Sequence, residues 1–107
     1  MSATSFVTTE VRILDNVGTI SCSGKFVKSG KSSPACLVAN DGPSGAWIVF
    51  GYNEVEALNQ SDGVEGTSST YVMAGDHIII GKGESDNFAA ITDEGNAKLY
   101  FHAGRNL

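Results

Sequence analysis

The residues of this 107-residue chain best able to do chemistry are its two histidines and two cysteines. A catalytic base must lie beside a nucleophile, but His77 and His102 each stand inside a β-branched or aromatic run typical of a strand. Neither a Gly-x-Ser-x-Gly elbow nor a recognisable pair of carboxylates accompanies them. The sequence therefore predicts that the protein is not an enzyme.

The cysteines do not form a metal-binding pattern. Cys22 and Cys36 are 14 positions apart, and with two distant histidines they do not match zinc-ligand spacing. Both lie in apolar, strand-like contexts, which favours reduced and buried thiols. A disulfide is the alternative if their strands are neighbours, although a cytosolic setting disfavours it. We expect no cofactor and no structural metal.

Two further ligand patterns fail on spacing. Gly30-Lys31-Ser32 resembles the end of a phosphate-binding loop, but Lys25 stands where the first glycine is required, and a strand follows instead of a helix. Asp62 and Glu65 lack the regularly spaced carboxylates of an EF-hand. A loop calcium site at these two residues stays an alternative, because such sites have no fixed spacing.

The charge balance argues against anionic partners. The net charge is -5 and the pI is about 4.7, whereas binding to nucleic acid or to an anionic membrane depends on lysine and arginine. No run reaches the ~18 apolar residues of a membrane-spanning helix, and residues 1–5 lack the features of a signal peptide. We expect a protein made in the cytoplasm, with neither nucleic acid nor membrane as a partner.

Short strand-like segments separated by glycine turns dominate the chain. Each is rich in β-branched or aromatic residues and ends in Gly, Asn, Asp or Ser, which is typical of strands. The pattern predicts an all-β protein, a single antiparallel β-sandwich of about eight short strands, with a jelly roll as a candidate topology. We expect residues 1–6 to form a flexible arm and residues 7–107 one domain. In the second half the strand segments are residues 35–40, 46–52, 69–73, 77–81, 87–92 and 97–102.

Several local features make sharper predictions. The turn at residues 40–45 predicts a hairpin that pairs residues 35–39 with residues 47–50. Asn53 and Glu56 could cap one helical turn. Alternation in residues 19–23 predicts a half-buried strand with Ile20 and Cys22 on one face. In the last strand, alternation puts one set of side chains in the core (Ala97, Leu99 and Phe101) and the other outside it (Lys98, Tyr100 and His102).

The aromatic residues allow a second reading. Trp47, Tyr52, Tyr71 and Tyr100 could stack on sugar rings. Trp47, however, stands beside Ile48-Val49-Phe50, a run expected in the core. Glycan binding is therefore the alternative and not the leading hypothesis.

The order of these segments resembles that of small tailed-phage virion structural proteins. The similarity covers residues 34–104 and is one of strands and turns, while residues 1–33 match nothing recognisable. The similar parts are an apolar strand ending in Asn40-Asp41-Gly42, the segment Trp47-Ile48-Val49-Phe50-Gly51, a Ser/Thr run before Val72-Met73-Ala74-Gly75, and a closing pair containing Ala89-Ala90-Ile91-Thr92 and Leu99-Tyr100-Phe101. The resemblance implies a short all-β structural component of the capsid decoration, cement or minor capsid type.

We therefore expect a non-enzymatic virion protein that binds and stabilises the outer capsid lattice. Its partner would be the major capsid protein, and copies would form a homo-oligomer, with a trimer as one candidate. Its location would be the capsid surface of the virion. The alternative is a glycan-binding, fibre or tail-associated module. The expected contact residues are Ser2, Thr4, Phe6, Glu54, Val55, Leu58, Asp62, Tyr100 and His102.

Overall fold

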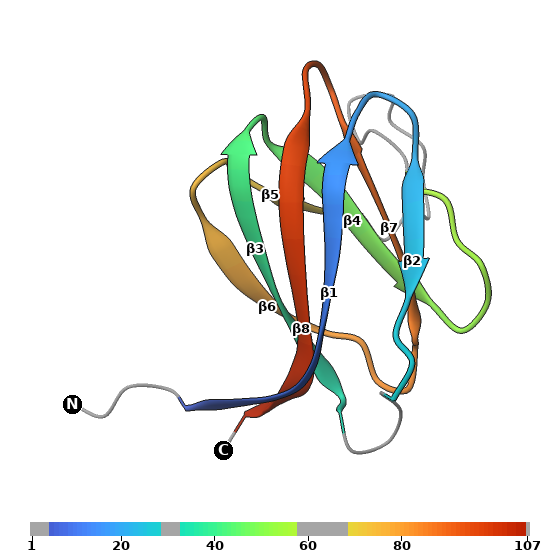
Figure 1. Cartoon of the computed structure of the whole chain (residues 1–107). Helices are drawn as coiled ribbons and strands as arrows, with labels where there is room; N and C mark the ends of the chain where they lie inside the picture. The colour runs from blue at the N-terminus through green and yellow to red at the C-terminus, as the bar shows by residue number, and fades with distance from the viewer. Residues whose placement is uncertain (1–4, 29–32, 58–68, 107) are drawn as a thin grey trace.

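The computed structural model describes residues 5–28, 33–57 and 69–106, and within them it contains strands and no helix (Figure 1). The strands form two four-stranded sheets in which all the pairings are antiparallel. The prediction of an all-β, eight-strand antiparallel sandwich is confirmed. The strands are β1 (Phe6–Val17), β2 (Cys22–Lys25), β3 (Ala35–Pro43), β4 (Ala46–Gly51), β5 (Thr70–Val72), β6 (His77–Gly81), β7 (Asn87–Thr92) and β8 (Ala97–Asn106).

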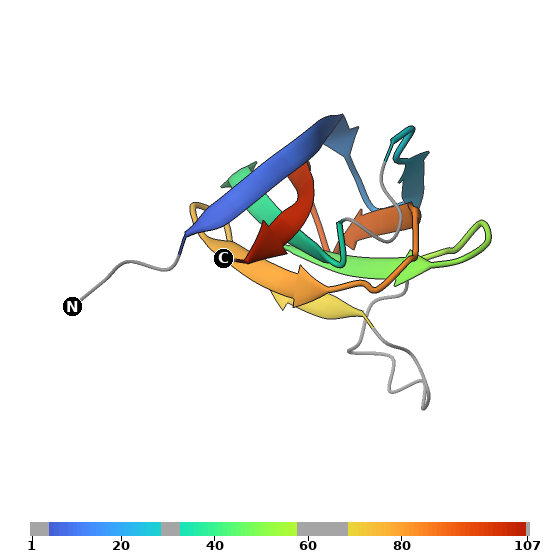
Figure 2. The ribbon, with the colours of Figure 1, turned by 90° about the horizontal axis from the view of Figure 1, so that it is seen from below.

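The strand order follows a simple rule. One sheet has the order β1-β8-β3-β6 and the other the order β2-β7-β4-β5. The first strand thus pairs with the last, the second with the seventh, the third with the sixth and the fourth with the fifth. In Figure 2, β1 and β6 lie at opposite edges of their sheet, with β8 and β3 between them.

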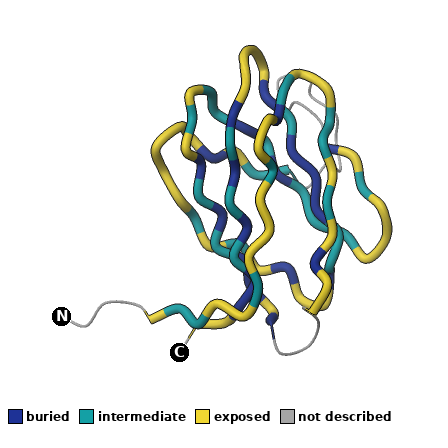
Figure 3. Tube along the Cα trace, in the orientation of Figure 1, coloured by how far each residue is buried: buried dark blue, intermediate teal, exposed yellow. Residues whose placement is uncertain are grey.

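The core lies between the sheets, and alternation along the strands supplies many of its side chains. Along β8, Ala97, Leu99 and Phe101 are buried while the residues between them are only partly buried, as predicted. The rings of Phe88 and Phe101 stack with centroids 4.2 Å apart. Each such buried side chain stabilises the fold by roughly 1.5–3 kcal/mol. Figure 3 shows the buried stretches on the strands that run through the middle of the sandwich.

The expected hairpin over residues 40–45 is wrong. β3 and β4 belong to different sheets, so this segment crosses from one sheet to the other. The reason is Asn40, whose buried side chain receives a hydrogen bond from the Gly42 amide (2.7 Å) and donates to the carbonyls of Ser44 (2.9 Å) and Val72 (3.0 Å). β3 meanwhile continues to Pro43 alongside β8, so the Asn-Asp-Gly sequence serves a crossover and not a tight turn.

Two smaller predictions also fail. The strand expected over residues 19–23 begins only at Cys22, and Ile20 is 83% exposed in the preceding bend. Residues 53–57 contain no helical turn; instead Ala57 is buried and its amide donates to Ser21 Oγ at 2.9 Å. Tertiary contacts with neighbouring segments decide both conformations, which local patterns do not reveal.

Both cysteines are free, and of the two thiols predicted to be buried only that of Cys36 is. Cys22 is half-buried on β2 and Cys36 is buried on β3, in opposite sheets. Burial raises the pKa of the Cys36 thiol to about 12, partly offset by the charge of Lys82. Cys36 therefore acts as a small apolar core residue.

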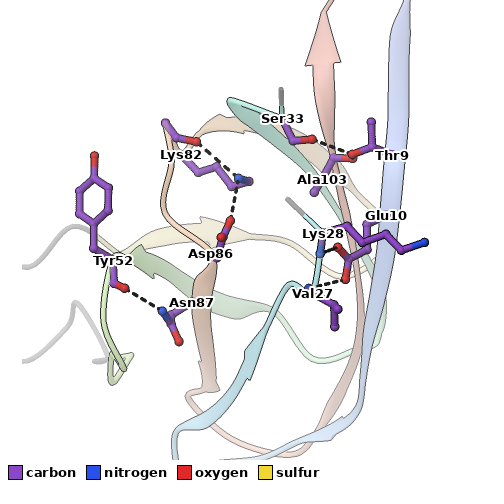
Figure 4. A network of polar contacts seen from close by, with 11 residues as sticks. Thr9, Glu10, Val27, Lys28, Ser33, Tyr52, Lys82, Asp86, Asn87 and Ala103 are labelled. Atoms are coloured by element: carbon purple, nitrogen blue, oxygen red, sulfur yellow. Dashed lines mark hydrogen bonds and ion pairs between the residues drawn. The ribbon is translucent and has the colours of Figure 1, made fainter. Parts of the chain in front are cut away.

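A network of polar contacts fastens one end of the sandwich (Figure 4). The Glu10 carboxylate accepts hydrogen bonds from the amides of Val27 (2.7 Å) and Lys28 (2.6 Å), which ties the segment after β2 to the edge strand β1. The hydroxyl groups of Thr9 and Ser33 lie 2.7 Å apart. These contacts lie away from the outer face of the β1-β8-β3-β6 sheet.

Candidate docking face

The outward side chains of the β1-β8-β3-β6 sheet line up in two rows that cross all four strands. In one row the register places Val11, His102, Leu37 and Ile79 side by side. The second row lies two residues away on each strand and contains Ile13, Tyr100, Ala39 and His77. We call the eight residues of both rows the apolar face: Val11, Ile13, Leu37, Ala39, His77, Ile79, Tyr100 and His102.

The composition of this face is unusual for a surface. The outward side of an antiparallel sheet is commonly polar when water covers it. Here three β-branched side chains are well exposed, namely Val11 at 46%, Ile13 at 49% and Ile79 at 41%. We take these exposed apolar side chains on the outer side of the sheet as a candidate interaction site.

Two of the expected contact residues lie at the centre of the face. Tyr100 and His102 both project outward from β8 and are half-buried between the side chains of β1 and β3. Burial lowers the pKa of His102 below its usual value. The Lys98 ammonium lies 5.4 Å from the centre of the Tyr100 ring and 3.5 Å from the Asp15 carboxylate.

A hollow of about 450 Å³ opens at the end of the face where the pairing of β3 with β6 ends. Its floor contains Leu37 and Ala39, and two carboxylates stand among its walls. We call it the acidic hollow; it is lined by Leu37, Ala39, Asn40, Asp41, Gly75, Asp76, His77 and Tyr100. Backbone hydrogen bonds from Asn40 N to Asp76 O (2.9 Å) and from Gly75 N to Asn40 O (2.8 Å) hold its two sides together.

The other expected contact residues do not join this face. Phe6 is half-buried at the start of β1, where it pairs with Asn106 at an end of the strand that bends away from the sandwich body (Figure 1). Glu54 and Val55 line hollows beside β2 and β7 of the other sheet. The remaining four lie outside the described residues: Ser2, Thr4, Leu58 and Asp62.

The expected core position of Trp47 is wrong. On β4 the inward positions are Ala46, Ile48 and Phe50, so the indole lies half-buried on the outer side of its sheet. Trp47 packs against Tyr71 with ring centroids 4.9 Å apart and donates from Nε1 to Asp93 Oδ1 at 3.2 Å. A continuous apolar run hides this alternation, because both faces of β4 carry large side chains.

The described part of the chain contains neither a metal-binding cluster nor a membrane-spanning helix. Residues 5–28, 33–57 and 69–106 contain no cluster of three or more His, Cys, Asp or Glu able to hold a metal ion. The calcium alternative at Asp62 and Glu65 falls outside these ranges. Among the same residues there is no helix of the length and apolar character needed to cross a membrane.

Comparison with known proteins adds no relative. No protein-family model, no curated protein and no solved structure gives a significant match to this chain.

Proposed function

We propose that this protein is a non-enzymatic structural protein of a virion, which binds the outside of a capsid lattice through the apolar face. Its partner is the major capsid protein. The observation that carries the proposal is the pair of outward rows on the β1-β8-β3-β6 sheet, with Val11, Ile13 and Ile79 exposed. A sheet with apolar side chains on both faces is expected to have its outer face covered by a partner.

The connectivity supports the same proposal. From the strand pairings β1·β8, β2·β7, β3·β6 and β4·β5 we infer the connectivity of a jelly roll, in which a long antiparallel hairpin is rolled up. Viral capsid domains and lectins are among the proteins that use it. The resemblance to tailed-phage virion proteins favours a structural role in a virion. The net charge of -5 favours the outer capsid surface over a DNA-filled interior.

The size of the face favours attachment in many copies. Four strands about 4.8 Å apart and two rows about 7 Å apart give an area of roughly 250 Å². A stable pairwise interface buries about 800 Å² on each partner, so the apolar face would be the centre of a wider contact. Homo-oligomers around a symmetry axis, with a trimer as one candidate, would add the avidity that a single weak contact lacks.

Co-sedimentation with emptied and mature phage capsids tests the proposal. The wild-type protein should bind at a saturable, fixed ratio to the major capsid protein. Ile79→Asp should reduce occupancy at least tenfold, because a charge would be desolvated within the apolar face. Ile20→Asp is the matched control, since Ile20 is 83% exposed and lies off the apolar face.

Circular dichroism and thermal melting must first show that both variants keep the fold. No binding by the folded wild-type protein would refute a role on the capsid. Binding by Ile79→Asp at wild-type occupancy would instead refute the assignment of the face.

Glycan binding is the second candidate, and Trp47 favours it. Its indole and the ring of Tyr71 lie on the outer side of the β2-β7-β4-β5 sheet beside the Asp93 carboxylate. Aromatic rings and carboxylates together suit sugar faces and hydroxyls. Trp47→Ala should then weaken binding on a glycan array while circular dichroism shows that the fold is kept. An array without any binding to the wild-type protein would remove this candidate.

A further inference from the structure

We propose that the acidic hollow receives an arginine side chain of the partner protein. The inference rests on the proposed function and deepens it, because it specifies one chemical feature of the capsid surface. The hollow shares Leu37, Ala39, His77 and Tyr100 with the apolar face, so a protein bound to that face would also reach the hollow.

The floor and wall of the hollow suit the aliphatic and planar parts of such a side chain. Ala39 stands between Tyr100 on β8 and His77 on β6 in the sheet register, so the floor is low and is flanked by two rings. Long cationic side chains commonly lay their methylene groups on apolar surface. The guanidinium plane stacks on aromatic rings, which a lysine ammonium does less well.

The charges at the rim complement a cation. Asp41 follows Asn40 on β3, and Asp76 precedes β6, so the two carboxylates reach the hollow from different segments. Asp76 Oδ1 accepts the His77 amide at 2.8 Å, which orients that carboxylate. Within the described residues the ion pairs are Lys82–Asp86 and Lys98–Asp15, so neither rim carboxylate takes part in one.

The neighbouring cation of this chain does not fill the hollow. Lys98 is on the same strand as Tyr100, but its ammonium lies 3.5 Å from Asp15 and is absent from the lining of the hollow. The site therefore combines an apolar floor, an aromatic wall and two carboxylates with room for a long side chain. This combination fits an arginine more closely than an acidic or purely apolar side chain.

Nuclear magnetic resonance titration of the full chain with N-acetyl-arginine amide tests the site directly. Saturable shifts should appear at amides lining the hollow, such as those of Ala39, His77 and Tyr100. N-acetyl-citrulline amide, which has nearly the same shape and no charge, should bind at least fivefold more weakly. Equal shifts from both compounds would overturn the inference.

Charge variants separate this site from a general effect of net charge. Asp41→Asn with Asp76→Asn should weaken the arginine compound at least tenfold. Glu84→Gln with Glu94→Gln removes the same number of charges at exposed positions outside the hollow and should leave binding within twofold. A similar loss with both pairs would show non-specific attraction and overturn the inference.

The same variants distinguish failure of this inference from failure of the proposed function. If wild-type protein binds capsids and Asp41→Asn/Asp76→Asn binds equally well with the same salt dependence, the arginine contact is wrong and the capsid role stands. If the arginine compound binds the hollow but no capsid binds the protein, the arginine site stands and the capsid role is wrong.

Discussion

Removing the Asn40 side chain should destabilise the protein more than any other single polar change at the crossover between the sheets. Asn40 is buried, and its amide group makes hydrogen bonds at 2.7, 2.9 and 3.0 Å to Gly42, Ser44 and Val72. These contacts join the end of β3, the crossover and the short strand β5. Asn40→Ala removes all three and leaves the backbone groups without these partners.

The magnitude follows from the number of bonds. A neutral hydrogen bond contributes about 0.5–1.5 kcal/mol to the net free energy of unfolding, so three predict a loss of about 3 kcal/mol. A domain of this size has a total stability of about 5–15 kcal/mol. The variant should therefore fold, but its melting temperature should fall by at least about 10 °C.

Urea denaturation followed by tryptophan fluorescence and circular dichroism measures this loss. Asn40→Asp is the informative companion, because it keeps the shape and the acceptor for Gly42 but replaces the donor that faces two carbonyl groups. The buried carboxylate should have a raised pKa, so this variant should gain stability relative to the wild type as the pH falls from 7 to 5. A loss below about 1 kcal/mol for Asn40→Ala would show that the backbone alone holds the crossover and would refute this reasoning.

Two further predictions concern groups with shifted pKa values. The thiol of Cys36 is buried and its pKa is about 12, so it should react slowly in the folded protein. In a Cys22→Ser variant at pH 8, a thiol reagent should label the native protein far more slowly than the urea-unfolded chain. Equal labelling rates would contradict the buried position. Because burial lowers the pKa of His102, its stabilising contribution is complete above pH 6.5 and is lost as the pH falls through the lower folded-state pKa. His102→Gln should therefore reduce the loss of unfolding free energy as the pH falls below 6.5. The same substitution at the exposed His77 is the comparison. An unchanged dependence of stability on pH in His102→Gln would count against the desolvation of this ring.

Much of the fold is predictable because its signals are local. β-branched runs closed by turn residues gave the existence of eight strands, and alternation assigned Leu99 and Phe101 to the core. The pairing of β3 was not predictable in the same way. A buried Asn40 side chain bonded to Val72, 32 positions away, overrides the turn preference of the segment that follows it.

The docking face was only partly predictable for a related reason. Alternation in β8 singled out Tyr100 and His102. Other members of the face, Val11, Leu37 and Ile79, come from three other strands whose register no local pattern shows. One signal was present in the run Ile78-Ile79-Ile80. An antiparallel strand without polar alternation has apolar side chains on both faces, and this pattern predicts a contact on its outer face as well.

The order of the strands links folding to docking. Each row of the apolar face draws on β1, β8, β3 and β6, and the residues of one row range from position 11 to position 102. The face therefore exists only when the first and last strands have paired and when the Asn40 crossover has placed β3 between β8 and β6. A partially folded chain would present isolated apolar residues without the rows or the acidic hollow, so a lattice that recognises both would select fully folded copies. For this reason Asn40→Ala should weaken capsid attachment in proportion to the fraction of unfolded protein, whereas Ile79→Asp should weaken it in fully folded molecules.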